Sequence, residues 1–215
     1  MTELRICFVG DSMTHGTQDK TTLGWPGRIC AQARRHGHDV SHFNLGIRRD
    51  TSQDIAKRWL AECQARLPST SPCAIVFSFG VNDMACDKDK LFRVPPSESH
   101  KFAQAIMTEA ASRWPVLWIS PVPIGRGGPN HGNRAAWLLE EDYQDKRLAQ
   151  LVIDYAAIAA TLKVPYLDLF TPLSRSRRWR WALGAGGDGI HPSAFGYSRM
   201  ARLIEGWPAW QAWLK

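Results

Sequence analysis

Residues 4–14 read Leu-Arg-Ile-Cys-Phe-Val-Gly-Asp-Ser-Met-Thr, which is an apolar run followed at once by a polar turn. The run Leu4–Val9 is short, rich in β-branched and aromatic residues, and predicts a buried β-strand. Gly10, Asp11 and Ser12 follow it directly. A helix is expected to begin after this turn, so the side chain of Ser12 should be exposed at the edge of the sheet.

Four further apolar runs are similar to the first in length and composition. They are Val40–Leu45, Cys73–Phe79, Val116–Ser120 and Tyr166–Phe170. None alternates strictly between apolar and polar residues, which is typical of strands that are buried on both faces of a sheet.

Longer segments with helical spacing of apolar residues separate these runs. They are Pro26–His36, Ser52–Leu67, Ser97–Trp114 and Ala135–Leu162. Asp50 or Thr51 is suited to cap the second segment, and Ser97 the third. The alternation of strands and helices predicts an α/β fold in which a parallel sheet has helices on both faces.

The chain has 215 residues, of which 44% are hydrophobic and 22% charged, so a sizeable core is available. No internal repeat, low-complexity tract or Pro/Gly-rich linker divides the sequence. Residues 1–215 are therefore expected to form a single domain.

Three more polar motifs follow apolar runs or precede the last helical segment. They are Asn44-Leu45-Gly46, Gly80-Val81-Asn82-Asp83 and Asp188-Gly189-Ile190-His191-Pro192. Together with Gly10-Asp11-Ser12 they form an ordered set that resembles the GDSL, or SGNH, hydrolase family over nearly the whole chain. The resemblance implies a flavodoxin-like, three-layer α/β/α fold with a five-stranded parallel sheet in the order 2-1-3-4-5. It also implies acyl hydrolysis.

The motifs supply the groups that such chemistry needs. A serine hydroxyl such as that of Ser12 is a poor nucleophile until a neighbouring base removes its proton. His191 is the candidate base, and Pro192 helps to start the helical segment behind it. Asp188 can fold back to accept a hydrogen bond from the other imidazole nitrogen, and glycines around it permit a tight backbone path. We expect Ser12, Asp188 and His191 to be catalytic.

The resemblance implies that three donors form an oxyanion hole: the backbone N–H groups of Ser12 and Gly46 and the side-chain amide of Asn82. Glycine lets the backbone approach a substrate closely, and an amide donates without bringing charge. Neighbouring polar residues are expected to brace the site loops by accepting backbone hydrogen bonds. These are Asp11, Asn44 and Asp83.

Two irregular stretches, Met84–Pro96 and Gly125–Arg134, follow predicted strands and are candidates for loops that shape the substrate site. Several polar residues on the same edge of the sheet are candidates to line the pocket: His15, Arg48, His131 and Asn133. Other histidines belong to no motif and are interpreted as surface or core residues: His36, His38, His42 and His100.

The net charge is +7, with a sequence pI near 9.4. One dense cluster, Arg175–Trp181, interleaves arginines with two tryptophans, a composition that suits nucleic acid or a membrane surface. No nucleic-acid-binding motif accompanies it. We therefore interpret the cluster as a solvated loop anchored by its tryptophans, and we expect no nucleic-acid partner.

The cysteines are widely spaced and match neither a zinc site nor a redox motif. The first residues show no signal-peptide pattern, so a cytoplasmic location with reduced thiols is expected. No uncharged apolar run approaches the ~20 residues that span a bilayer, so no transmembrane segment is expected.

Other site classes fit the sequence less well. The first turn, Gly10–Gly16, lacks both the G-x-G-x-x-G pattern of dinucleotide sites and the G-K-[ST] of phosphate loops. No G-x-S-x-G elbow is present, which disfavours the ordinary α/β-hydrolase fold. Asp188 and His191 alone are too few to hold a metal, so neither a metal nor an organic cofactor is expected.

The sequence therefore predicts a serine ester hydrolase that acts on a small-molecule carboxylic ester or thioester, with a short acyl chain, through an acyl-serine intermediate. A carbohydrate O-deacetylase of the same fold is the first alternative. A ligand-binding module without catalytic activity is an alternative of a different class.

Overall fold

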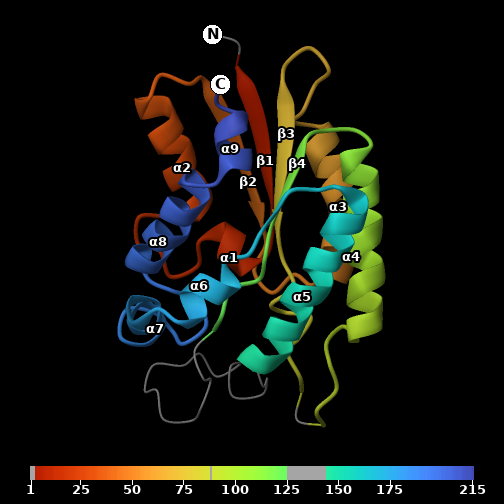
Figure 1. The fold of residues 1–215 in the computed structure, drawn as a ribbon, viewed down its shortest axis with the longest axis vertical. Coiled ribbons are helices and arrows are strands. Elements are labelled where there is room, and N and C mark those ends of the chain that lie inside the picture. Colours follow the sequence, from red (N-terminus) through yellow and green to blue (C-terminus); the bar gives the residue numbers. More distant parts are fainter. Residues whose placement is uncertain (1–2, 88, 125–143) are drawn as a thin grey trace.

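A computed structural model describes residues 3–87, 89–124 and 144–215. In these ranges a five-stranded sheet in the order β2-β1-β3-β4-β5 runs through the centre of the molecule (Figure 1). The strands are β1 (Leu4–Gly10), β2 (Val40–Gly46), β3 (Cys73–Ser78), β4 (Val116–Ile119) and β5 (Tyr166–Leu167). All neighbouring strands pair in parallel, so the predicted fold class and strand order are confirmed.

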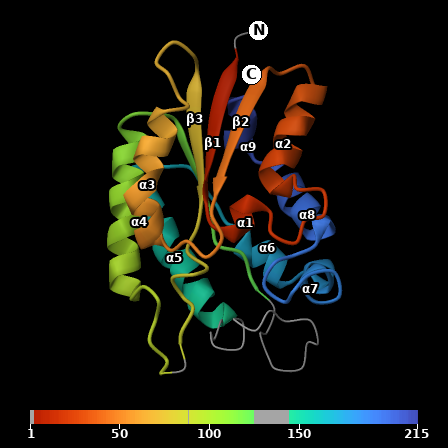
Figure 2. The same cartoon turned by 180° about the vertical axis from the view of Figure 1, so that it is seen from behind.

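Helices cover both faces of the sheet. The described helices are α1 (Ser12–His15), α2 (Gly24–Arg35), α3 (Ser52–Gln64), α4 (Pro96–Ala111), α5 (Asp145–Leu162), α6 (Phe170–Ser174), α7 (Arg177–Gly184), α8 (Ala194–Glu205) and α9 (Pro208–Ala212). α3, α4 and α5 lie on one side of the sheet, and α2, α8 and α9 lie on the other (Figures 1 and 2). The central strands are consequently buried on both faces, as their apolar sequences predict.

The helix caps agree with the sequence at one site and differ at another. Thr51 caps α3 through a capping box: its hydroxyl accepts a hydrogen bond from the Asp54 N–H, and the Asp54 carboxylate accepts one from the Thr51 N–H. The prediction of Ser97 as the cap of α4 is wrong. The helix begins one residue earlier, at Pro96, because the fixed φ of proline suits the first helical position.

The last strand is shorter than the predicted run Tyr166–Phe170. Only Tyr166 and Leu167 pair with β4. The Ser120 hydroxyl then accepts hydrogen bonds from the N–H groups of Leu169 (2.9 Å) and Phe170 (3.3 Å), which turns the chain into α6. An apolar run can continue into a buried helix, and composition alone does not mark where the strand ends.

The interpretation of Arg175–Trp181 as a loop with two anchoring tryptophans is also wrong. Ser176 caps α7 by accepting a hydrogen bond from the Trp179 N–H at 3.2 Å, and the helix continues to Gly184. The Trp179 ring is buried and donates to the Pro123 carbonyl at 2.8 Å, whereas Trp181 is 56% exposed. Residues two apart on a helix point in nearly opposite directions, so only one of the two rings faces the core.

Part of the remaining predictions falls outside the described residues. Helix α5 begins at Asp145, and the segment 135–143 of its predicted range is among the residues not described. The same holds for the proposed loop Gly125–Arg134. The other proposed loop, Met84–Pro96, is irregular where it is described, apart from an isolated antiparallel bridge between Cys86 and Phe92.

None of the helices in the described ranges combines the length and the apolar composition that crossing a bilayer requires.

Candidate active site

Ser12, His191 and Asp188 form a continuous hydrogen-bonded chain. Ser12 is the first residue of α1, immediately beyond the carboxyl end of β1, and is 6% exposed. Its Oγ lies 2.7 Å from Nε2 of His191, which is 2% exposed. Nδ1 of the same ring lies 2.8 Å from Oδ2 of Asp188. Because a carboxylate only accepts, Nδ1 carries the proton, and Nε2 of the neutral ring then accepts from the serine hydroxyl.

Asp188 is held as an ionised carboxylate. Its Oδ1 accepts hydrogen bonds from the backbone N–H groups of Ile190 (3.0 Å) and His191 (2.7 Å), while Oδ2 receives the imidazole. Burial opposes ionisation, but the hydrogen bonds and charge of His191, together with the backbone donors, outweigh it and lower the pKa of Asp188 below its ordinary value. Asp188 therefore stays negative across the neutral range and fixes the orientation of the imidazole.

The loop that carries both Asp188 and His191 is hydrogen-bonded to the last turn of α7. The carbonyl of Leu183 accepts from the N–H of Gly189 at 2.8 Å, and that of Ala182 accepts from the N–H of Ser193 at 3.1 Å. A Cβ atom on Gly187 would lie 2.1 Å from the His191 carbonyl oxygen and 2.8 Å from the carbonyl oxygens of Ala182 and Leu183 on this turn. Backbone packing thus requires glycine at position 187, whereas Gly189 is favoured by its positive φ of 92°.

Asp11 fixes the turn that presents Ser12. Its Oδ1 accepts from the Met13 N–H at 2.9 Å and caps α1, while Oδ2, which is also buried, has no hydrogen-bond partner in the described structure. Burial, followed by the charges of Asp83 and Asp50, raises the pKa of Asp11 from 3.8 to about 7. Asp11 can therefore carry a proton near neutral pH, directly beside the candidate nucleophile.

Gly46, one of the predicted oxyanion donors, pairs with Gly10 at the ends of β1 and β2. Its N–H donates to Oδ1 of Asn44 at 3.0 Å, and Nδ2 of Asn44 donates to the Thr14 carbonyl at 2.9 Å. Asn44 thus ties β2 to α1, and in this structure it engages the Gly46 donor. A Cβ atom on Gly46 would lie 2.2 Å from the backbone nitrogen of His15, so no side chain fits.

Asn82, the other predicted donor, is buried beyond the carboxyl end of β3, the strand next to β1. Its Nδ2 donates to the Asp50 carbonyl at 2.9 Å. That contact fixes the plane of the amide relative to the turn that precedes α3.

Asp83 anchors two helices behind the site. It is fully buried; Oδ1 accepts from the Ser52 N–H at 2.7 Å and Oδ2 from the Ser99 hydroxyl at 2.5 Å. The Ser99 oxygen also lies 2.8 Å from the Tyr155 hydroxyl. Burial raises the pKa of Asp83 although these hydrogen bonds oppose the shift. The carboxylate joins the starts of α3 and α4 to α5.

Arg58 has a role at the site that the sequence did not reveal. From α3 its guanidinium donates to the Gly10 carbonyl at 3.0 Å and to Asp50 Oδ2 at 2.7 Å. It also pairs with Glu62 at 2.7 Å, one helical turn later. The spacing to Glu62 predicts an ordinary surface ion pair, and no sequence signal indicates the contact with Gly10.

The sequence profile of the GDSL-like lipase/acylhydrolase family matches residues 8–199. The chain belongs to this family. It is thus a GDSL, or SGNH, hydrolase of the esterase type. A comparison with curated proteins finds no match.

Solved structures of similar fold agree with the topology of this hydrolase. A lipase/acylhydrolase from Enterococcus faecalis superposes with a TM-score of 0.71 at 22% identity, with 94% of this chain and 93% of that chain covered. A structure of TesA gives a TM-score of 0.70 at 21% identity, covering 98% and 99%. A catalytic mutant of Axe2, an acetylxylan esterase from Geobacillus stearothermophilus, gives 0.67 at 18% identity, covering 95% of each chain. At these identities the likeness concerns the fold.

Only two of the four proposed pocket-lining residues of the hydrolase lie in the described part of the chain. His15 is exposed at the end of α1, with Nδ1 3.4 Å from the Thr17 hydroxyl. Arg48 is exposed beyond β2. His131 and Asn133 lie outside the described residues. Their contribution to a substrate pocket stays a prediction.

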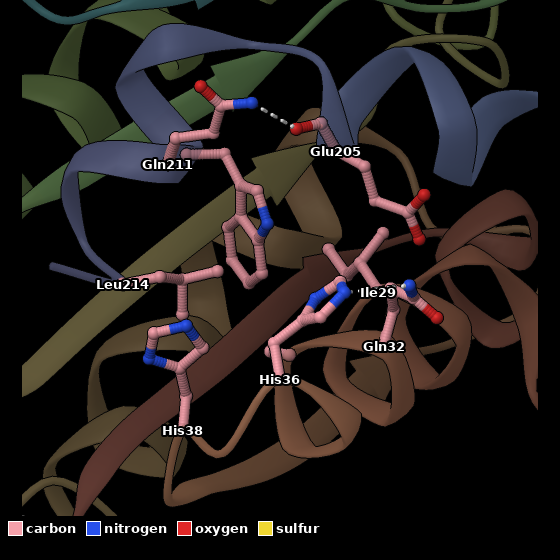
Figure 3. Close-up of a pocket in the computed structure, with 9 residues that line it drawn as sticks. Ile29, Gln32, His36, His38, Glu205, Gln211 and Leu214 are labelled. Atoms are coloured by element: carbon pink, nitrogen blue, oxygen red, sulfur yellow. Dashed lines mark hydrogen bonds between the residues drawn. The ribbon is translucent and has the colours of Figure 1, made fainter.

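One cavity of the hydrolase, about 340 Å³ in volume, lies between the C-terminal part of α2, the end of α8 and α9 (Figure 3). His36, His38 and Glu205 line it, with Gln211 donating to the Glu205 carbonyl at 3.0 Å. These histidines precede β2, whereas Ser12 follows β1, so the cavity belongs to the opposite end of the sheet. Within the described ranges no group of three or more His, Cys, Asp or Glu side chains is placed to hold a metal.

Proposed function

We propose that this family member is a serine ester hydrolase that works through an acyl-serine intermediate. The observation that carries the proposal is the 2.7 Å contact between Ser12 Oγ and His191 Nε2, with Asp188 on the far side of the ring. A nucleophile, a base and an orienting carboxylate in hydrogen-bond contact form the arrangement that activates a hydroxyl for acyl transfer.

The geometry gives each group a step. Ser12 Oγ attacks the ester carbonyl carbon while His191 Nε2 accepts the hydroxyl proton, and Asp188 stabilises the imidazolium that results. The tetrahedral intermediate collapses when the C–O bond to the leaving alcohol breaks and His191 returns its proton to that oxygen. Water then attacks the acyl-serine with His191 as base, which releases the carboxylic acid and regenerates Ser12.

The oxyanion donors in this proposal are the N–H groups of Ser12 and Gly46 and the amide of Asn82. Family membership and their position beyond β1, β2 and β3 support the assignment. The Gly46 N–H serves the oxyanion only when Asn44 Oδ1 shares or releases it. Each such donor typically contributes about 3–4 kcal/mol to stabilisation of the transition state.

A short acyl chain is the proposed substrate feature. Ser12 is 6% exposed and His191 is 2% exposed, so an acyl group must reach a recessed nucleophile, which favours a small group. A sugar O-acetyl group is the second candidate. The structural likeness to an acetylxylan esterase supports it, and an acetyl group meets the same size limit.

The test is hydrolysis by the purified protein of nitrophenyl esters of increasing chain length, acyl-CoAs and acetylated sugars, with Ser12→Ala as control. We expect turnover that falls with acyl length and a loss of at least about a thousandfold in Ser12→Ala. A fluorophosphonate probe should label Ser12 covalently, which mass spectrometry detects. Full activity in Ser12→Ala would overturn the assignment of Ser12 as the nucleophile. Tight ligand binding by the parent without turnover would favour the alternative of a binding module without catalytic activity.

A further inference from the structure

Helix α7 presents a basic and aromatic surface to solvent. Figure 1 shows the helix at the end of the molecule toward which the strands point. We define the α7 patch as Arg177, Arg178, Arg180 and Trp181 together with Phe195 from the first turn of α8. All five side chains are exposed, and neither the proposed catalytic chain nor the core uses them.

The helix is divided cleanly into two faces. Its buried residues Trp179, Ala182 and Leu183 follow one another around a single side of the helix. At 100° per residue, Arg177 and Trp181 lie at the middle of the opposite side, and Arg178 and Arg180 lie at its two margins. One face therefore holds the helix on the domain, and the other combines an exposed ring with three positive charges.

The two aromatic residues of the patch form one apolar projection. Trp181 is 56% exposed and Phe195 is 40% exposed, and their ring centroids lie 5.8 Å apart with an interplanar angle of 84°. Single exposed hydrophobic residues are ordinary on protein surfaces. Two large rings that touch each other while both remain open to solvent form a patch and favour an interaction site.

The charge of the patch is not neutralised by the domain itself. In the described structure no ion pair reaches Arg177, Arg178 or Arg180, and the only hydrogen bond from one of these guanidinium groups runs from Arg180 to the Ser174 carbonyl at 3.2 Å. The protein as a whole carries +7. The complementary partner is therefore anionic and offers an apolar layer to the rings.

We propose that the α7 patch docks on the surface of an anionic phospholipid bilayer, with Trp181 and Phe195 among the headgroups and the arginines on lipid phosphates. Arginine on the polar side and tryptophan toward the acyl boundary are the features of helices that lie in a membrane interface. Nucleic acid fits less well. The edge-to-face contact of the rings covers one of the faces on which a base would stack.

The patch is physically continuous with the acid–base loop. The carbonyls of Trp181, Ala182 and Leu183, on the last turns of α7, accept hydrogen bonds from Gly186, Ser193 and Gly189 at 2.8–3.3 Å. Docking of α7 thus holds the loop of Asp188 and His191 close to the bilayer surface. That this placement helps the enzyme to hydrolyse esters in the membrane rests on the proposed function. The docking of α7 on the bilayer does not depend on that function.

The experiment measures cosedimentation with phosphatidylcholine vesicles that do or do not contain phosphatidylserine. It uses the Ser12→Ala protein, so that binding is read without lipid hydrolysis. We expect binding only to the anionic vesicles and release at high salt. Arg177→Ala/Arg178→Ala/Arg180→Ala should weaken binding on the order of a hundredfold, since each arginine near an anionic surface contributes roughly fivefold. Trp181→Ala/Phe195→Ala should weaken binding but keep its salt dependence.

The matched control removes the same charge from α3, α4 and the turn after α4, on the opposite face of the sheet, with Lys57→Ala/Lys101→Ala/Arg113→Ala. It should bind as the parent does. If both triple variants bind the vesicles equally weakly, the binding depends only on net charge, and the proposal that the α7 patch docks on the bilayer is wrong. Absence of vesicle binding by the parent would also overturn the proposal. Tighter binding of a single-stranded oligonucleotide through the same side chains would overturn the lipid assignment. Circular dichroism and hydrolysis of a water-soluble ester, with Ser12 restored, check that each variant is folded.

Discussion

Arg58 and Gly10 are joined by a hydrogen bond of 3.0 Å from the guanidinium to the backbone carbonyl at the end of β1. The same guanidinium donates to the side-chain carboxylate of Asp50. The backbone carbonyl of Asp50 in turn accepts a hydrogen bond from the side-chain amide of Asn82. One side chain of α3 therefore supports the turn before Ser12 and the residue that orients Asn82, a proposed oxyanion donor.

Replacing Arg58 with methionine keeps the aliphatic stem and removes these donors. We expect kcat/KM to fall roughly tenfold to a hundredfold, because a preorganised donor loses much of its effect when its orientation is lost. Steady-state kinetics on a soluble ester measures the change. Arg113→Met is the matched control, because Arg113, in the exposed turn after α4, forms the same kind of ion pair with Glu109, four residues away. A loss of equal size in both variants would show that Arg58 acts only on stability.

Asp188→Asn tests the orienting carboxylate. The amide can still accept from the His191 N–H through its oxygen, but an NH₂ group facing Nδ1 favours the wrong tautomer of the ring. We expect kcat to fall about 10³–10⁴-fold with the fold retained. Kinetics together with thermal unfolding checks both parts. Activity within a few-fold of the parent would mean that His191 takes its orientation from another group.

Gly46→Ala tests how closely β2 packs on α1. The new Cβ would meet the His15 nitrogen at 2.2 Å and the Thr14 carbonyl carbon at 2.7 Å, and both are backbone atoms that cannot rotate away. We expect a loss of at least about 2–3 kcal/mol in unfolding free energy and loss of activity. Gly184→Ala is the control, since its Cβ would meet nothing within 4 Å, and it should be neutral or slightly stabilising. Denaturant unfolding of both proteins gives the comparison.

The sequence patterns predicted the parallel sheet, whereas the resemblance to the GDSL family implied the strand order and the meeting of Ser12 with His191. Buried parallel strands leave continuous apolar runs, and their carboxyl ends share one edge of the sheet, so motifs that follow them are brought together. Ends of elements were less predictable. Ser120 turns the chain through side-chain hydrogen bonds with residues about 50 positions away, and no local pattern encodes such a contact.

Among the site residues, too, those in short local motifs were predicted, and those that act through distant contacts were not. Ser12, Asp188 and His191 carry distinctive side chains in short motifs, whereas Arg58 acts through a backbone carbonyl 48 positions away and resembles any helical surface arginine. The helical conformation within Arg175–Trp181 was not predicted because a short run of Arg and Trp residues has no strong helix pattern. The cap at Ser176 and the burial of Trp179 establish the helix.

Asp11 gives a prediction for the pH dependence of stability. Burial, reinforced by Asp83 and Asp50, raises the pKa of its carboxyl group from 3.8 to about 7. Between these values the folded protein retains a proton that the unfolded chain has lost. Because the unfolded state then binds fewer protons, stability falls as the pH rises through this window, by up to about 4 kcal/mol from this group, and levels off above it.

Asp11→Asn removes this titration while an amide oxygen can still accept from the Met13 N–H. The unpartnered Oδ2 would become a buried NH₂, which costs about 1–3 kcal/mol independently of pH. The informative quantity is therefore the slope: the unfolding free energy of the parent minus that of the variant should decrease steadily from a pH of about 4 to about 7. Denaturant titrations across this range measure it, and an infrared band of a protonated carboxyl that disappears in the variant would identify the proton. Parallel curves for the two proteins would show that Asp11 is already ionised in the folded state and that its buried oxygen is stabilised by another route.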